Sequence, residues 1–306
     1  GLYVLVDPIL PGEIPNTHSG TGMIMGLLPE EADRLKRGPV EAAGAGQTLA
    51  PGEIAVRANF ATIEHRQGKF LITDRRAGRI TKGTHELAEA LTNVDLGDGI
   101  TGRFLPTDQH RGVIILSGPG LHDAISDTDP GDLNMPAALK ICQQLEPEAE
   151  LTAVKVNRFI IEAHQLLADH PVNATRVRDG KLPANGLITR GAGSRFELDN
   201  TLINQGLKVA LVSGCNTVLG LGSIFGFEVI TDERFTADID TDLDAKIWAV
   251  RKALNKNNLV YVHIKAPDIC SHDRQPLAKR DFLQRIDQSL KPLLESGATI
   301  AVAADH

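Results

Sequence analysis

The chain is poor in aromatic side chains, and it lacks an excess of positive charge. Phe, Trp and Tyr make up 4% of its 306 residues, which argues against a surface on which the bases of single-stranded nucleic acid could stack. The net charge is −7 and the isoelectric point is about 5.8. A phosphate backbone is bound by clustered Lys and Arg, so we expect no nucleic-acid partner.

Long apolar runs and paired cysteines are also missing. No apolar run is long enough to span a membrane, and the first residues do not have the pattern of a signal peptide. The three cysteines, Cys142, Cys215 and Cys270, lie far apart and are odd in number, which suggests reduced thiols. With 42% apolar and 23% charged residues, the composition is typical of a globular protein. We expect a cytoplasmic protein without a membrane partner.

Carboxylates and imidazoles follow two apolar runs near the end of the chain. Asp268 and His272 come after residues 259–264, and Asp305 and His306 come after residues 298–303. Both runs are typical of buried strands, and side chains at the carboxyl ends of parallel strands are well placed to hold metal ions. Either segment alone could be a solvated loop. Together they indicate two divalent ions that clamp a phosphoryl group.

Both ends of the sequence suggest a longer protein. Gly1 leads directly into the apolar residues 2–6 without an initiator Met, and the last residue, His306, is itself a candidate ligand. A domain rarely stops on a residue that carries its chemistry. We therefore expect further residues on both sides.

The first half of the chain has the pattern of an α+β module. A Gln67–Gly68 turn separates two apolar stretches and predicts a hairpin, and Thr84 is a plausible N-cap for a helix. The expected strands are 54–60, 69–73, 102–105 and 112–116, and the expected helix is 84–91.

From about residue 150, strands and helices alternate, which is typical of a doubly wound parallel sheet. Trp248 is expected on the apolar side of its helix. The expected helices are 153–170, 243–255 and 278–294, and the expected strands are 207–212, 227–230, 259–264 and 299–303. We predict one α/β domain from residues 1–50 and 150–306, with an α+β domain inserted at 51–149.

Arginines recur beside glycines in what should be loops. Residues 74–79, Asp-Arg-Arg-Ala-Gly-Arg, place three guanidinium groups within six positions, and Arg57, Arg111 and Arg190 add more. A guanidinium binds phosphate or carboxylate through two parallel hydrogen bonds. Any one of these arginines could be a solvated loop residue. Their recurrence in an acidic protein indicates a site for a small anion.

Hydroxyl side chains lie among glycines at residues 16–22, Asn-Thr-His-Ser-Gly-Thr-Gly. Such a segment suits a nucleophile, because backbone N–H groups in a tight loop can meet a phosphoryl oxygen. A bound metal would also lower the pKa of the hydroxyl. The same composition is typical of an ordinary loop, so function and loop remain alternatives at this point.

Taken together, these segments resemble the cofactor-independent phosphoglycerate mutases of the archaeal type, in the alkaline phosphatase superfamily. The resemblance covers nearly the whole chain. It rests on residues 37–46, 57–62, 74–79, 110–111, 127–130, 183–185 and 190–193, and on the two segments that contain Asp268 and Asp305.

The resemblance implies an alkaline-phosphatase-like core with an inserted, substrate-clamping domain. It also implies a glycolytic enzyme that interconverts 2- and 3-phosphoglycerate through a phosphoenzyme, with two divalent ions, typically manganese or zinc. Asp268 and His272 would bind one ion, and Asp305 and His306 the other. Thr17 and His18 would be catalytic, with Thr17 also a metal ligand. The implied substrate-binding residues are Arg57, Asp74, Arg75, Arg79, His110, Arg111, Asp129 and Arg190.

The sequence departs from the family at two positions that matter for chemistry. Thr17 and His18 stand where the family has serine and aspartate, and Leu219 stands where it has a lysine that assists at the phosphoryl group. Other branches of the superfamily use threonine as the nucleophile. The alternative is therefore a metal-dependent phosphatase, phosphodiesterase or phosphonate-processing hydrolase. A non-catalytic metal-binding or anion-binding protein is a third possibility, which the four metal-ligand candidates argue against.

Overall fold

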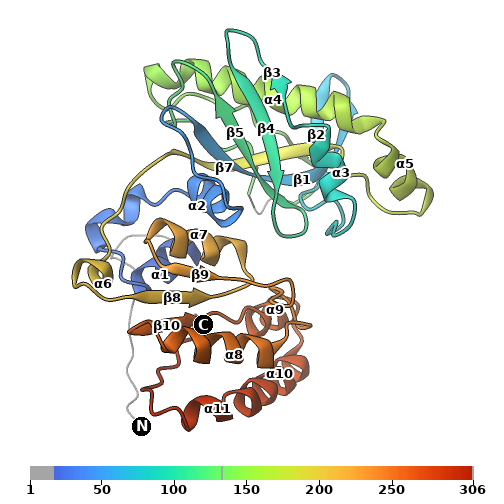
Figure 1. Cartoon of the computed structure of the whole chain (residues 1–306). Helices are drawn as coiled ribbons and strands as arrows, with labels where there is room; N and C mark the ends of the chain where they lie inside the picture. Colours follow the sequence, from blue (N-terminus) through green and yellow to red (C-terminus); the bar gives the residue numbers. More distant parts are fainter. Residues whose placement is uncertain (1–16, 132–133, 305–306) are drawn as a thin grey trace. The chain divides into compact units, whose positions relative to one another are not determined.

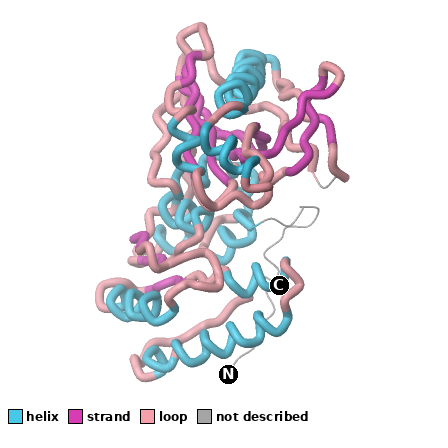
Figure 2. The backbone as a smooth tube through the Cα atoms, turned by 90° about the vertical axis from the view of Figure 1, so that its right-hand side faces the viewer, coloured by secondary structure: helices cyan, strands magenta, loops and turns pink. Residues whose placement is uncertain are grey.

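The computed structural model describes residues 17–131 and 134–304, and these form two compact units (Figure 1). Lys36–Phe196 make one unit, here called the antiparallel unit. The described residues up to Leu35, together with those from Glu197 onward, make the other, here called the parallel unit. Figure 2 shows that most of the strands belong to the antiparallel unit, whereas helices predominate in the parallel unit.

The antiparallel unit is built on a seven-stranded sheet with β1 (Ile54–Arg66) at its centre. Residues 54–59 of β1 pair with β5 and residues 54–61 pair with β7, while residues 62–66 pair with β2. The strand order is β3-β4-β5-β1-β2-β6, and β7 also pairs with β1. The other strands are β2 (Lys69–Asp74), β3 (Val94–Asp95), β4 (Thr101–Pro106), β5 (Arg111–Ser117), β6 (Ala137–Ala138) and β7 (Gly186–Ser194).

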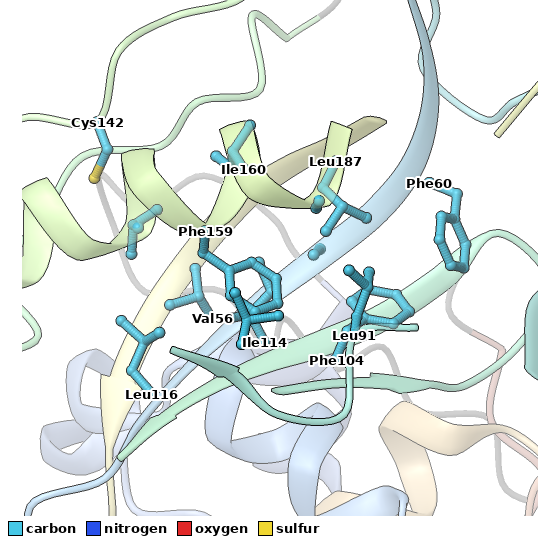
Figure 3. Close-up of a cluster of buried hydrophobic side chains, with 14 of the residues drawn as sticks. Val56, Phe60, Leu91, Phe104, Ile114, Leu116, Cys142, Phe159, Ile160 and Leu187 are labelled. Atoms are coloured by element: carbon cyan, nitrogen blue, oxygen red, sulfur yellow. The ribbon is translucent and has the colours of Figure 1, made fainter. Parts of the chain in front are cut away.

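One face of this sheet packs against helix α4 (Glu150–Ala168). Val56 and Phe60 from β1, Phe104 from β4 and Phe159 from α4 are almost completely buried there (Figure 3). The rings of Phe60 and Phe104 lie 4.7 Å apart between centroids. Successive strand residues point to opposite faces, so the alternate residues of β1 face away from α4. Helices α3 (Thr84–Glu89) and α5 (Pro171–Arg178), and the 3-10 turn η2 (Pro147–Ala149), belong to the same unit.

Helix α2 (Arg37–Gly44) packs on the opposite face of the sheet, against β1, β5 and β7. Ala42 joins Ala55, Val113 and Ile115 in a small apolar cluster. The backbones are in direct contact, because a Cβ atom at Gly38 would lie 2.0 Å from the carbonyl oxygen of Ala55. Only glycine permits this approach, and it fixes the start of α2 beside β1.

The parallel unit contains a three-stranded parallel sheet of order β10-β8-β9, formed by Leu259–Val262, Val209–Val212 and Glu228–Ile230. Leu211 packs towards Gly222 of α7, whereas Val212 packs with Ile247 and Val250 of α8. Helices therefore cover both faces of this sheet. The helical elements are α1 (Thr17–Ile24), η1 (Pro29–Arg34), α6 (Thr201–Asn204), α7 (Asn216–Ile224), α8 (Leu243–Leu254), α9 (Ala266–His272), α10 (Pro276–Ser289) and α11 (Lys291–Leu294).

Most of the expected elements form, including the hairpin of β1 and β2 and the parallel pairing of β8, β9 and β10. The strand expected at 299–303 is wrong: these residues have no regular structure, and Val302 is 85% exposed. A strand needs a neighbour for its backbone hydrogen bonds, and within the described residues none of the three parallel strands pairs with this segment.

Three smaller expectations also need correction. Trp248 is 61% exposed, because the buried stripe of α8 runs through Leu243, Ile247 and Val250 and Trp248 falls outside it. The N-cap of α3 is Gly83 rather than Thr84. The helix expected at 278–294 is divided into α10 and α11 at Leu290.

The units divide at positions other than 50 and 150, the domain boundaries expected from the sequence. The antiparallel unit extends from Lys36 to Phe196, because α2, α4 and β7 pack on the antiparallel sheet. The chain is thus a mixed α/β protein whose larger sheet is antiparallel. No helix in the described part of the chain is long and apolar enough to cross a membrane.

Candidate functional site

Strand pairing brings arginines from three neighbouring strands onto one face of the antiparallel sheet. Arg57 and Asn59 are alternate residues of β1 on the face away from α4. Arg190 of β7 lies opposite Arg57, and Arg111 of β5 lies opposite Asn59. Directly opposite residues of antiparallel strands place their side chains on the same face. The three guanidinium groups therefore share this face.

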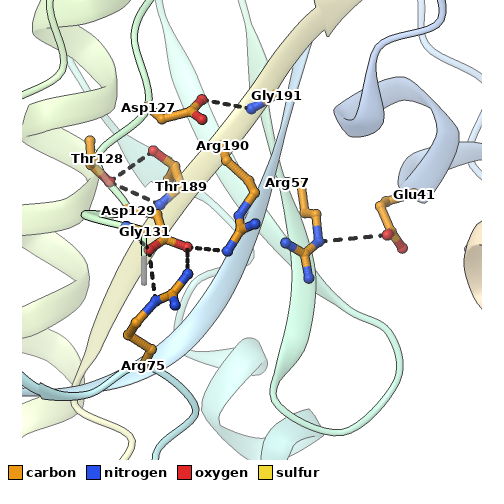
Figure 4. Close-up of polar contacts among 10 residues, drawn as sticks. All are labelled: Glu41, Arg57, Arg75, Asp127, Thr128, Asp129, Gly131, Thr189, Arg190 and Gly191. Carbon is orange, nitrogen blue, oxygen red and sulfur yellow. Dashed lines mark hydrogen bonds and ion pairs between the residues drawn. The ribbon is translucent and has the colours of Figure 1, made fainter. Parts of the chain in front are cut away.

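Asp129 holds two arginines of the site. Its carboxylate accepts two hydrogen bonds from Arg75, Nε to Oδ1 and Nη2 to Oδ2, each 2.8 Å long. Arg190 Nη2 also donates to Oδ2 (Figure 4). Burial raises the pKa of Asp129, but the hydrogen bond from Arg75 and the charge of Arg190 outweigh it, so that the pKa lies below its ordinary value. Thr128 anchors this loop to β7 through a side-chain hydrogen bond of 3.0 Å to Thr189.

Glu41 of α2 faces two further arginines. Its Oε1 lies 3.3 Å from Nε of Arg37. The same atom lies 3.7 Å from Nε of Arg57 (Figure 4). Arg57 is only 5% exposed. Burial and, next, the charge of Arg37 lower the pKa of Arg57 to about 9 despite Glu41, so Arg57 is still charged at neutral pH. We call Arg37, Arg57, Arg75, Arg111 and Arg190 the arginine cluster.

Several donors of the arginine cluster are buried without a hydrogen-bond partner among the described residues. Glu41 pairs with Arg37 and Arg57, and Asp129 pairs with Arg75 and Arg190. A buried polar group without a partner costs about 1–3 kcal/mol, and a small anion would remove this cost at the guanidinium donors. Five buried atoms in and beside the cluster have no hydrogen-bond partner among the described residues: Arg57 Nε, Asn59 Oδ1, His110 Nδ1, Arg111 Nε and Arg190 Nε.

His110 lies within the field of these arginines. Burial and, next, the charge of Arg111 lower its pKa to about 3, with Arg76, Arg57 and Arg79 contributing in the same direction. The ring is therefore neutral at physiological pH, and it can donate one hydrogen bond and accept another.

The loop of residues 74–79 contributes unequally to the site. Asp74 accepts hydrogen bonds from the backbone N–H groups of Arg76 and Gly78, at 2.8 and 3.0 Å, and so stabilises the turn. Arg79 acts on His110 through its charge. The substrate-binding residues predicted from the sequence did not include Arg37, Glu41, Asn59 or Arg76. The spacing of Asn59 from Arg57 could have identified Asn59, because residues two apart in a strand point to the same face.

Two of the metal-ligand candidates, Asp268 and His272, lie in the parallel unit. Asp268 and His272 are four residues apart on α9, which follows β10. The distance between His272 Nε2 and Asp268 Oδ1 is 3.4 Å. Lys265 Nζ also contacts Asp268, at 2.5 Å. A carboxylate and an imidazole on one helix face fit two ligand positions of manganese or zinc. The described residues contain no group of three or more such side chains, and Asp305 and His306 lie outside these residues.

The candidate nucleophile is the first residue of α1. The side chain of Thr17 lies outside the described part of the structure, and His18 is half-buried. Leu219 is half-buried in α7. Thr17, His18, Asp268 and His272 thus belong to the parallel unit, and the eight predicted substrate-binding residues belong to the antiparallel unit.

The fold is that of a mixed α/β protein, and the arginine cluster is its candidate site for a small anion. Residues 1–173 match the family model described as 2,3-bisphosphoglycerate-independent phosphoglycerate mutase. Proteins of that name from Methanopyrus kandleri and Archaeoglobus fulgidus are 37% and 36% identical over 314 and 316 residues, covering all of this chain and 74% and 75% of theirs. The chain belongs to this family of isomerases.

Solved structures agree with this assignment. The cofactor-independent phosphoglycerate mutase from Thermoplasma acidophilum has a TM-score of 0.59 and 32% identity to this chain. The match covers 95% of this chain and 71% of that one. The present chain therefore spans about three quarters of the length of these relatives.

Proposed function

We propose that this protein is a metal-dependent phosphoglycerate mutase whose substrate binds at the arginine cluster. The observation that carries this proposal is the set of buried guanidinium nitrogens without hydrogen-bond partners among the described residues, in a chain of this family. A phosphoglycerate carries a phosphoryl group and a carboxylate, and each can accept two parallel hydrogen bonds from one guanidinium. Nε of Arg57 and Nε of Arg111 are buried donors without a hydrogen-bond partner among the described residues, whereas Asp129 orients Arg75 and Arg190.

We propose Thr17 as the nucleophile. Its hydroxyl oxygen would bond to phosphorus while the bond from phosphorus to one glycerate oxygen breaks, and the reverse step would deliver the phosphoryl group to the other oxygen. His18, the next residue of α1, is the nearest side chain in sequence that can accept the hydroxyl proton. The arginines would hold the glycerate in the site between the two steps.

Two divalent ions, manganese or zinc, would be held by Asp268 with His272 and by Asp305 with His306. When bound, such ions neutralise charge on a phosphoryl group and lower the pKa of a coordinated hydroxyl. The position of Asp268 and His272 just after a parallel strand covered by helices on both faces supports an alkaline-phosphatase-like core. In this proposal the antiparallel unit is the inserted domain that clamps the substrate.

One observation favours a hydrolase as the second candidate. Leu219 cannot donate a hydrogen bond or offset charge, whereas cationic donors stabilise the transition state of phosphoryl transfer. A hydrolase that forms a phosphothreonine would release the acid and let water resolve the phosphoenzyme. A mutase must retain the acid for the second transfer.

Phosphorus NMR of the manganese-loaded protein with 3-phosphoglycerate separates these candidates. We expect the 2-phospho isomer to appear without free phosphate. Release of inorganic phosphate would contradict the mutase and support the hydrolase. Absence of any reaction with either manganese or zinc would contradict both for this substrate.

A further inference from the structure

We infer that Asn59 recognises the free hydroxyl group of the substrate, and that it selects phosphorylated hydroxy acids over their deoxy analogues. This inference rests on the proposed function and deepens it. Asn59 lies on β1, two residues from Arg57 and on the same face. It lies opposite Arg111 of the neighbouring strand β5. It thus stands among the guanidinium groups that would bind the anionic groups of the substrate.

The side chain of Asn59 is buried without being satisfied. It is 6% exposed, and its Oδ1 has no hydrogen-bond partner among the described residues. The large majority of buried polar side-chain atoms in proteins have a partner. An exception inside a binding site indicates that the partner is supplied by a ligand.

Asn173, in the same unit, is a buried amide with a structural role and serves as a comparison for Asn59. It is 1% exposed, and its Nδ2 donates to the carbonyl oxygens of Leu167 and Ala184, at 2.8 and 3.0 Å. Its Oδ1 accepts from the backbone N–H of Ala184 at 2.7 Å. Asn173 therefore connects segments of the fold, whereas the Oδ1 of Asn59 forms no such connection within the described part of the chain.

The hydrogen-bonding chemistry of the site indicates that the partner of Asn59 Oδ1 is a hydroxyl group. Guanidinium groups only donate, and the ionised phosphoryl and carboxylate groups only accept, so these groups satisfy one another. A hydroxyl also has a proton to donate and needs an acceptor. Glu41 and Asp129 already face arginines. Asn59 supplies an acceptor, and the neutral ring of His110 is the other candidate.

The test compares 3-phosphoglycerate with 3-phosphonooxypropanoate, which lacks the hydroxyl, by calorimetric titration of the full-length, metal-loaded protein. We expect the wild type to bind the hydroxylated acid about five- to tenfold more tightly, as one hydrogen bond predicts. Asn59→Leu should bring this ratio close to one. Asn59→Ala, which is smaller, serves as the second variant.

Thermal unfolding without ligand gives the matched control. Asn59→Leu removes an unsatisfied polar atom, so its midpoint should stay at or above that of the wild type. Asn173→Leu breaks three hydrogen bonds and should lower the midpoint.

Two outcomes overturn the inference and leave the mutase proposal intact. One is a wild type that binds both acids equally. The other is a wild-type ratio that persists in both Asn59 variants, which would shift the role to His110. A wild type that binds neither acid contradicts the proposed function, and the inference with it.

Discussion

At the scale of single residues, the arginine cluster should contribute more to binding than to stability. Arg57 is buried near other arginines, and its Nε has no hydrogen bond within the described part of the chain. Arg57→Leu should therefore leave the free protein at least as stable, because Glu41 keeps Arg37 as a partner. We expect the dissociation constant for 3-phosphoglycerate to rise about 10- to 100-fold, as for the loss of a charged hydrogen bond.

Arg176 is the control for this prediction, since its guanidinium group has a structural role. Its Nε donates to the carbonyl oxygen of Leu182 at 2.9 Å, and its Nη2 donates to that of Ala77 at 2.8 Å. Arg176→Leu should lower the thermal midpoint, whereas Arg57→Leu should weaken binding measured by titration calorimetry. A destabilised Arg57→Leu with unchanged binding would make Arg57 a structural residue.

His110 should make stability depend on pH. Its pKa is about 3 in the folded protein and about 6.5 in an unfolded chain. Between these values the unfolded state binds the proton and the folded state does not, so stability rises with pH across this window. Acidification from pH 7 to pH 5 should destabilise the wild type more than His110→Gln in urea unfolding. Asp129 does not confound this range, because an Asp whose pKa is lowered loses its contribution only below about pH 4.

At the scale of elements, the contact between α2 and β1 positions Arg37 and Glu41. A Cβ atom at residue 38 would lie 2.0 Å from the Ala55 carbonyl oxygen and 2.6 Å from its carbon, and both atoms belong to the backbone. Gly38→Ala should therefore cost at least about 2 kcal/mol, in the range of overpacked sites, and should weaken substrate binding by displacing α2. Gly20→Ala in α1 meets no atom within 4 Å and should be neutral or stabilising in the same urea experiment.

Local patterns predicted the elements better than they predicted the contacts between them. The hairpin followed from Gln67–Gly68, whose φ angles of 51° and 74° suit a tight turn. The strand expected at 299–303 failed because strand formation depends on a partner as well as on composition. Recurring arginines predicted an anion site, and strand pairing places three of them, Arg57, Arg111 and Arg190, on one face of the sheet. The Asp129–Arg75 pair, however, joins residues 54 positions apart, and no local pattern reveals that.

At the scale of the whole molecule, the candidate chemistry is divided between two units. The predicted anion-binding residues belong to the antiparallel unit, and Asp268, His272 and the start of α1 belong to the parallel unit. The chain passes between the units after Leu35 and after Phe196. Metal binding and anion binding should therefore respond to different substitutions, although turnover needs both.

This division predicts a separable effect of metal removal. Manganese that binds only the folded state should raise the thermal midpoint, by an amount equivalent to about 2.7 kcal/mol at one hundred times its dissociation constant. The single tryptophan, Trp248, lies on α8 of the parallel unit, so its fluorescence follows the unfolding of that unit. Chelation should lower the midpoint of the wild type more than that of Asp268→Asn, which keeps Asp305 and His306 for the other ion.

The binding of 3-phosphoglycerate to Asp268→Asn completes this test. If the arginine cluster holds the acid without help from the metal ligands, the dissociation constant of the metal-free variant should match that of the metal-free wild type. Arg57→Leu should show the reverse pattern, with the manganese-induced shift retained and the acid bound weakly. Loss of both responses in either variant would mean that metal binding and acid binding cannot be separated by substitution, and would contradict this prediction.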